Sequence, residues 1–246
     1  MCGIVGYIGN QDTTSFLLDG LKELEYRGYD SAGIALLNDK KIDVFKALGK
    51  LENLKEKISN ATLDEYHIGI GHTRWATHGK PTELNAHPHL GEYSYVVHNG
   101  IIENYKELKE ELIALGHKFV SQTDTEVIVH LFENYLNKEI TESKENTTKA
   151  FKQTIKRLEG AFSILLISKA DPSTIFFFKH GSPLIIARGK DEKEVLFSSS
   201  DAPLIGLAND VVYLEDGVGG TASTSGIEFF SDNYSWSTLP TSKQFA

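Results

Sequence analysis

The chain has 246 residues, 40% of them hydrophobic, and a formal net charge of −9. This length and apolar content can bury one large core, and no Pro-, Gly- and Ser-rich stretch separates two halves, so we expect one main globular domain. Because Lys and Arg are thinly spread, the charge argues against a nucleic-acid partner. No apolar run approaches the ~20 residues that a membrane helix needs.

Apolar periodicity predicts mainly strands at the two ends of the chain and helices in the middle. In the first half we expect strands at 2–8, 31–37, 41–48, 67–75 and 93–100, the last of which stops at Asn99-Gly100. Helices are expected around 16–24, 104–115, 128–136 and 151–158, and further strands at 161–168, 174–180, 183–188, 194–199, 211–216 and 226–230. This order favours an α+β fold in which helices cover the outer faces of antiparallel sheets.

Cys2 is the only cysteine of the chain and directly follows Met1. A lone thiol forms no internal disulfide, and the N-terminus has no export signal, so we expect a cytoplasmic protein. If Met1 is removed, Cys2 carries a thiol and a free α-amine. The amine, with a pKa of roughly 7.7–8.0, can accept the thiol proton and later give it to a leaving group. The alternative is a small apolar residue at the start of a strand.

Five stretches carry a family resemblance: MCGIVGYIG at 1–9, EYRGYDSAG at 25–33, GHTRWATHGKPTELNAHPH at 71–89, VVHNGIIENY at 96–105 and SQTDTEV at 121–127. Together they resemble the glutaminase domain of the class II glutamine amidotransferases. The resemblance implies the N-terminal-nucleophile hydrolase fold, a four-layer αββα sandwich of two antiparallel sheets. It covers residues 1–217, and we expect 218–246 to be a tail that leads to a second module.

The resemblance also implies roles for particular residues. Cys2 attacks the side-chain amide of L-glutamine, and Asn99 and Gly100 form the oxyanion hole. An amide N–H and an unobstructed backbone N–H suit that task. Without the resemblance, Asn99-Gly100 indicates a hairpin turn.

Substrate binding is expected from charged and polar side chains. A free amino acid carries opposite charges, so Arg74 would bind its α-carboxylate and Asp124 its α-ammonium. Alone, these residues indicate a surface arginine and a helix cap. The remaining expected contributors are Thr77 and His78 with hydrogen bonds to substrate, Trp75 as a gate or else a core residue, and Arg27, Gly28, His87 and His98 as structural support.

The resemblance implies no cofactor and no metal ion. Within the family, LEYRGYDSAGIA and GHTRWATHG are most similar to the members that use fructose 6-phosphate as ammonia acceptor to make glucosamine 6-phosphate. The sugar-isomerase module that binds this acceptor has no room in 246 residues, and we expect the full-length enzyme to be a homo-oligomer.

Three alternatives stay open. A metal-binding protein is suggested by six histidines between His67 and His98, among them the His87-Pro88-His89 pair. A glutamine sensor without turnover would need only the binding residues. The glutaminase domain of another class II enzyme would share the same site and differ in its acceptor module.

Overall fold

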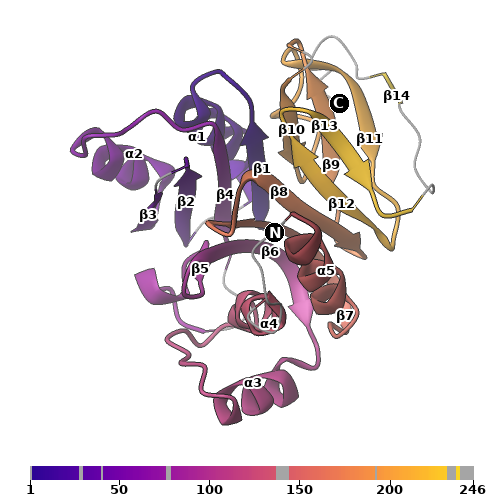
Figure 1. Ribbon diagram of the computed structural model, residues 1–246. Coiled ribbons are helices and arrows are strands. Elements are labelled where there is room, and N and C mark those ends of the chain that lie inside the picture. The colour runs from indigo at the N-terminus through magenta and orange to yellow at the C-terminus, as the bar shows by residue number, and fades with distance from the viewer. Residues whose placement is uncertain are drawn as a thin grey trace.

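The computed structural model describes residues 2–27, 30–39, 41–75, 79–136, 144–191, 193–231 and 237–238. Two antiparallel sheets form its centre (Figure 1). The larger sheet has the strand order β14 (Ser237–Thr238), β11 (Ala208–Tyr213), β9 (Ile185–Gly189), β10 (Val195–Ser198), β1 (Gly3–Ile8), β4 (Ile68–Arg74), β2 (Ser31–Leu37), β3 (Ile42–Leu48). The smaller sheet has the order β13 (Gly226–Phe229), β12 (Val218–Ser223), β8 (Asp171–His180), β7 (Gly160–Ser168), β6 (Ser94–Ile102), β5 (His89–Leu90).

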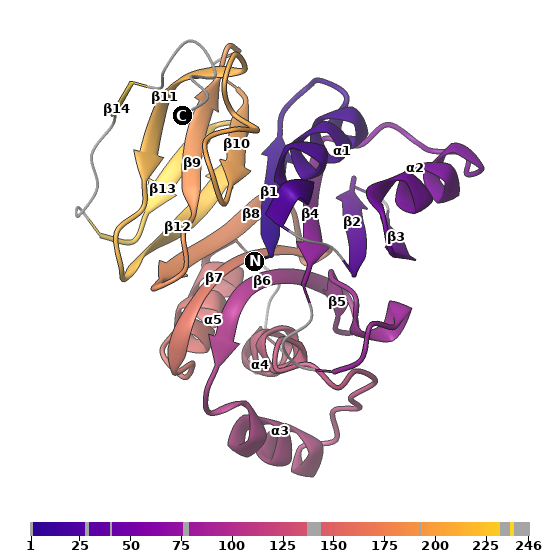
Figure 2. The same ribbon diagram turned by 180° about the vertical axis from the view of Figure 1, so that it is seen from behind.

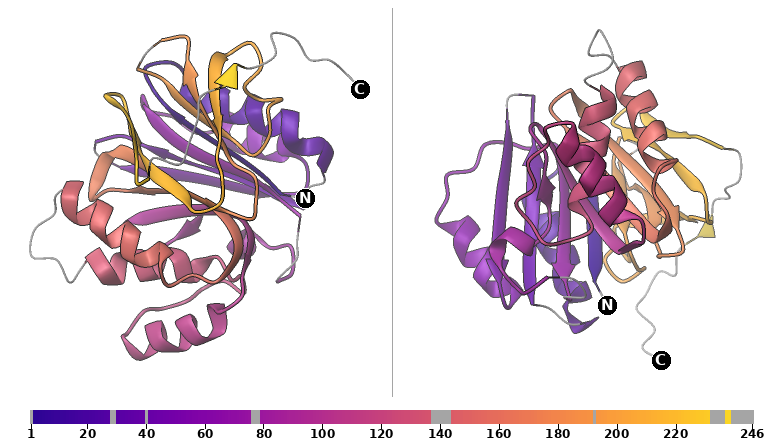
Figure 3. Two further views of the ribbon diagram at one scale, coloured as in Figure 1. Left: turned by 90° about the vertical axis from the view of Figure 1, so that its right-hand side faces the viewer. Right: turned by 90° about the horizontal axis from the view of Figure 1, so that it is seen from below.

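Helices cover the outer face of each sheet (Figures 2 and 3). The larger sheet is covered by α1 (Thr13–Leu24) and α2 (Leu51–Ser59). On the smaller sheet lie α4 (Glu126–Leu136) and α5 (Lys144–Ile155), with α3 (Tyr105–Ala114) packed on α4. Short 3₁₀ turns occur at Glu25–Arg27 and Glu83–Asn85. The predicted four-layer αββα sandwich is confirmed.

Strand β1 shows why the layers form. Its side chains alternate: Val5 and Tyr7 pack with the helix-side cluster, whereas Ile4 and Ile8 pack in the cluster between the two sheets. Both faces of β1 are buried, so its sequence GIVGYI is apolar throughout instead of alternating with polar residues. A third cluster fills the space between the smaller sheet and its helices.

Helix α1 follows local rules that the sequence displays. The Asp12 carboxylate caps its start by accepting a hydrogen bond from the Ser15 N–H at 3.1 Å. Leu17, Leu21 and Leu24 recur at helical spacing and are fully buried against the sheet. None of the helices in the described ranges has the length and the apolar character that a membrane crossing requires.

The structure differs from the sequence-based expectations in several places, and the helix expected around 151–158 spans Lys144–Ile155 instead. Strand β6 does not stop at Asn99-Gly100 but continues to Ile102, because Gly100 takes a φ of 122° inside the strand and still pairs with Phe162. Helix α2 was not predicted, although Leu51, Leu54 and Ile58 form its buried face.

Strand β12 was not predicted either, and it lies within the expected tail. It pairs with β8 on one side and with β13 on the other, so residues 218–229 belong to the smaller sheet. The division of the chain at 217/218 stays a prediction, and so does a second module after the tail.

Candidate active site

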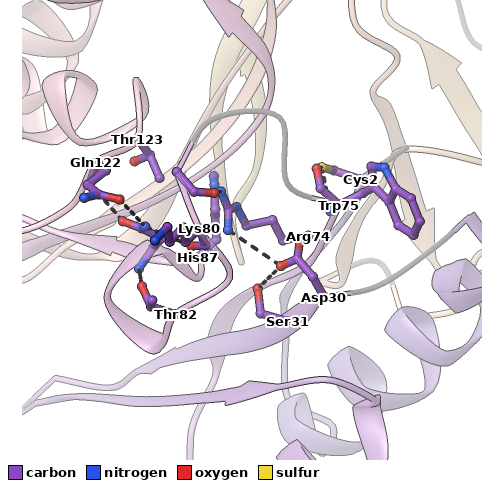
Figure 4. Close-up of polar contacts among 12 residues, drawn as sticks. Cys2, Asp30, Ser31, Arg74, Trp75, Lys80, Thr82, His87, Gln122 and Thr123 are labelled. Atoms are coloured by element: carbon purple, nitrogen blue, oxygen red, sulfur yellow. Dashed lines mark hydrogen bonds and ion pairs between the residues drawn. The ribbon is translucent and has the colours of Figure 1, made fainter.

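Neighbouring strands of the larger sheet bring the first group of site residues together. Cys2 directly precedes β1, and the pairing of Gly3 with Thr73 places the end of β4 beside it. Strand β2 pairs on the other side of β4, with Ser31 opposite Arg74, and so adds Asp30. Figure 4 shows Arg74 extending toward Asp30, with Cys2 near the backbone of Trp75.

The thiol of Cys2 is held by the backbone at the end of β4. The Trp75 N–H donates to Sγ at 3.3 Å, and the thiol donates to the Trp75 carbonyl oxygen at 3.5 Å. Burial raises the pKa of the Cys2 thiol above its ordinary value, against the lowering effects of the Trp75 hydrogen bond and the Arg74 charge. The thiol is therefore protonated near neutral pH, and a nucleophilic role requires a base.

The smaller sheet contributes the two predicted oxyanion residues through β6. Asn99 is 7% exposed, and its Nδ2 donates to the Cys2 carbonyl oxygen at 3.3 Å. At Gly100 a Cβ atom would lie 2.0 Å from the Ala161 carbonyl oxygen, and the positive φ also favours glycine. The geometry therefore puts an amide donor beside the residue that carries the thiol.

Arg74 and Asp124 are both buried, at 4% and 5% exposure. Arg74 Nη1 lies 3.6 Å from the Asp30 carboxylate, and Nη2 donates to the Gly79 carbonyl oxygen at 3.1 Å. Asp124 comes from the segment before α4, where its Oδ2 accepts from the Ile102 N–H at 2.8 Å. Neither residue is a simple surface charge.

One small cavity connects these groups. It has a volume of about 30 Å³, room for a water molecule or two. Its lining consists of Cys2, Arg74, Trp75, His87, His98, Gly100, Thr123, Asp124 and Thr125. A much larger hollow of about 750 Å³ lies along α5, but Lys, Glu, Gln and Thr line it and it contains no thiol or imidazole.

Trp75 is 54% exposed, which excludes the alternative that it packs in the core. His87 and His98 are buried and contact Thr125 from different directions: His98 Nδ1 lies 3.0 Å and His87 Nε2 lies 3.4 Å from its hydroxyl oxygen. The His98 N–H also donates to His87 Nδ1 at 3.3 Å. Both histidines thus connect β6 and the segment before β5 to Thr125, which directly precedes α4.

Sequence reasoning missed two further histidines in this cluster and one carboxylate. The ring of His72 stacks on His87 at 3.9 Å, and His89 meets the same ring edge-on at 4.6 Å. Burial lowers the pKa of His72 to about 3, and it lowers the pKa values of His87 and His89 well below the ordinary range, so these rings are neutral at pH 7. Asp30, in the quoted motif EYRGYDSAG, had no predicted role.

Some expected site residues cannot be placed. Gly28, Thr77 and His78 lie outside the described residues, as does the side chain of Arg27, whose backbone ends the turn at Glu25–Arg27. In the described ranges, no three or more His, Cys, Asp and Glu side chains are grouped so that they could hold a metal ion. The His87-Pro88-His89 pair instead lies in the buried cluster, where His89 Nε2 is 3.1 Å from the Thr123 hydroxyl oxygen.

Two of the curated proteins to which the chain is similar carry the same name. The chain is 57% identical over 216 residues to glutamine–fructose-6-phosphate aminotransferase [isomerizing] from Campylobacter jejuni, covering 88% of this chain and 35% of that protein. It is 49% identical to the Helicobacter pylori protein of the same name, covering 94% of this chain and 37% of that protein. The chain thus spans about a third of the length of these relatives.

Among solved structures, an allosteric regulatory enzyme of purine biosynthesis superposes with a TM-score of 0.78 and 25% identity, over 94% of this chain and 50% of that one. The glutamine phosphoribosylpyrophosphate amidotransferase from B. subtilis shares the fold with a TM-score of 0.77, 24% identity and the same two coverages. The family model described as a glutamine amidotransferase domain matches residues 72–205, which include the end of β4 and all of β6 and α4. Because this match covers more than half of the chain, the chain belongs to the glutamine amidotransferase domain family.

Proposed function

We propose that this chain hydrolyses the side-chain amide of L-glutamine with Cys2 as the nucleophile. One observation carries the proposal: the thiol of Cys2, the oxyanion-type residue Gly100 and the opposite charges of Arg74 and Asp124 line the same small cavity. A free amino acid carries both an α-carboxylate and an α-ammonium group, and the two charged side chains complement them.

The reaction uses the two groups of a processed Cys2. After removal of Met1, the α-amine takes the thiol proton and Sγ attacks the amide carbon of glutamine. The carbon–nitrogen bond breaks, the protonated amine supplies the leaving group with its proton, and ammonia departs from a γ-glutamyl thioester. The amine then takes a proton from water, whose oxygen attacks the thioester, and glutamate and the free thiol are regenerated. The raised pKa of the buried thiol makes this base necessary.

The negative oxygen that forms in each step needs hydrogen-bond donors. Asn99 Nδ2, which contacts the Cys2 carbonyl oxygen, and the backbone N–H of Gly100 are the proposed donors. Loss of one such donor typically lowers kcat by about 10²–10³-fold. Trp75, half-exposed at the edge of the cavity, is proposed to control passage out of it.

The relatives extend the proposal beyond this chain. Their name states an aminotransferase that acts on glutamine and fructose 6-phosphate, and the matched region is only about a third of their length. We therefore infer that this domain supplies ammonia to a sugar-isomerase module that binds fructose 6-phosphate. A cytoplasmic location and a homo-oligomeric full-length enzyme stay predictions from the sequence.

The test compares three preparations of the chain whose intact masses are measured first: protein without Met1, protein that retains Met1, and Cys2→Ala without Met1. We expect release of ammonia and glutamate from glutamine only by the first. Activity in the Met1-retaining form at full rate would overturn the role of the α-amine. Glutamine binding by Cys2→Ala, measured by calorimetry, separates loss of chemistry from loss of binding. If the unsubstituted, processed protein binds glutamine without ammonia release, it is a sensor.

A further inference from the structure

His72 occupies a buried position next to Asn99. It lies on β4, is 1% exposed, and faces β6 of the other sheet. Its Nε2 atom is 3.0 Å from Asn99 Oδ1 and 3.1 Å from the His98 carbonyl oxygen. One ring nitrogen therefore contacts both the side chain of Asn99 and the backbone of the residue before it.

The His98 carbonyl oxygen determines which nitrogen of His72 carries the proton. A backbone carbonyl only accepts hydrogen bonds, so Nε2 must be the donor. Because burial keeps the ring neutral, it carries one N–H only, and Nδ1 is unprotonated. Stacking on His87, with ring centroids 3.9 Å apart and planes 13° from parallel, holds the ring in this orientation.

The same N–H determines the orientation of the Asn99 amide. With Nε2–H as donor, the atom of Asn99 that faces His72 must be the acceptor, Oδ1. The other end, Nδ2, then faces the Cys2 carbonyl oxygen at 3.3 Å, where a donor is required. If the Asn99 amide were flipped, its NH₂ group would face the His72 N–H, and its oxygen would face the Cys2 carbonyl oxygen. Neither contact could form a hydrogen bond, so the flipped orientation is unfavourable at both ends.

We propose that His72 is a positioning residue that aims the Asn99 amide donor at the reacting carbonyl oxygen above Cys2. This inference rests on the proposed function, because it assumes that Asn99 stabilises the oxyanion. His72 acts through Asn99 and has no direct contact with substrate in this role.

The decisive experiment is a double-mutant cycle on protein without Met1, with kcat and KM for glutamine hydrolysis as readouts. His72→Phe keeps a flat ring that can stack on His87 but has no N–H. We expect it to lower kcat by about 10- to 100-fold, less than the loss of a whole oxyanion donor, with KM changed by less than about threefold. His72→Gln, which offers an N–H of similar reach, should recover most of kcat. In the Asn99→Ala background, His72→Phe should cost less than about threefold, because the residue through which it acts is gone.

His89→Phe is the matched control, since it removes another histidine of the same buried cluster whose hydrogen bond goes to Thr123. The fold-loss in kcat that His89→Phe causes should be the same in the unsubstituted protein and in the Asn99→Ala background. An equal fold-loss from His72→Phe in both backgrounds would show a merely structural role and overturn the inference. If instead Asn99→Ala alone leaves kcat unchanged, the oxyanion role in the proposed function fails, which is a separate result.

A spectroscopic readout covers the case in which His72→Phe folds poorly. In ¹⁵N-labelled Cys2→Ala protein, the side-chain amide signals of Asn99 are identified by their loss in Asn99→Ala. We expect His72→Gln to shift them moderately and His72→Phe to shift them further or broaden them. Signals that are the same in all three proteins would contradict the proposed contact.

Discussion

Arg74 and Asp30 form an ion pair at the edge of the candidate active site, with 3.6 Å between Nη1 and Oδ1. Arg74 is 4% exposed, so its positive charge is stabilised inside the protein by a carboxylate from the neighbouring strand end. The Ser31 hydroxyl donates to the same Oδ1 at 2.9 Å and orients it. The protein thus already holds a carboxylate against the arginine that is proposed to bind the substrate's carboxylate.

Asp30→Asn should increase the amount by which glutamine or glutamate raises the Tm of the protein. Loss of this partner is expected to destabilise the fold by about 1–3 kcal/mol, because a buried charge keeps fewer compensating hydrogen bonds. Glutamate or glutamine brings a replacement carboxylate, so either should raise Tm more in Asp30→Asn than in the unsubstituted protein. Differential scanning fluorimetry with and without ligand measures this. Asp19→Asn, at an exposed position of α1, is the control, and equal ligand shifts in all three proteins would contradict the prediction.

Cys2 should be slow to alkylate at neutral pH while Met1 is present. Since burial raises its pKa, the thiolate fraction at pH 7 is smaller than for an ordinary thiol of pKa about 8.5. The rate of iodoacetamide addition, followed by intact mass, should still be rising above pH 9. As the chain has one cysteine, each adduct reports this site. If the alkylation rate reached half of its maximum below about pH 8.5, the pKa of the thiol would not be raised by burial. Protein without Met1 should react faster between pH 7 and 8, because the α-amine then acts as a base.

The buried histidines should destabilise the protein in mild acid. Their pKa values are lowered on folding, so below about pH 6.5 the unfolded chain binds protons that the native state excludes. The free energy of unfolding should therefore fall as pH decreases, by about 1.4 kcal/mol per pH unit for each such histidine. Urea unfolding at pH 7.5, 6.5 and 5.5 tests this. In His89→Gln the free energy of unfolding should depend less steeply on pH, by the contribution of one histidine, and an unchanged slope would refute the assignment.

Gly100→Ala should destabilise the protein by about 2–4 kcal/mol, from backbone strain together with overpacking. The added Cβ would lie 2.0 Å from the Ala161 carbonyl oxygen and 2.8 Å from Phe162 Cα, so β6 and β7 must separate. Gly116→Ala is the matched control: its φ is also positive, at 96°, but nothing lies within 4 Å of the added atom. Chemical denaturation should show a loss of only about 1 kcal/mol there. Equal losses at the two positions would mean that strain alone explains Gly100.

The sequence by itself was sufficient for most of the strands and helices and for the family, and it singled out Cys2 as the candidate nucleophile. A cysteine directly after Met1 carries both a thiol and an α-amine once Met1 is removed, and this property does not depend on the fold. The spacing of Leu17, Leu21 and Leu24 likewise depends only on helix geometry. The spacing of Leu51, Leu54 and Ile58 was an equally readable signal for α2, in a segment otherwise rich in charged residues.

Only the tertiary structure decided how the site is held together. Strand β12, with the sequence VGGTAS, has little apolar periodicity and exists because β8 and β13 pair with it. Asn99-Gly100 has the sequence of a turn, yet strand pairing with Ser163 and Phe162 keeps it extended. The partners of Asp30 and His72 lie 44 and 27 residues away along the chain. Pairing of β2 with β4 brings Asp30 to Arg74, whereas packing of the two sheets brings His72 to Asn99, and neither contact can be read from the sequence. A sequence pattern predicts which face of a helix or strand is buried. Which residue contacts that face depends on the register of the neighbouring strands, and the sequence pattern does not contain it.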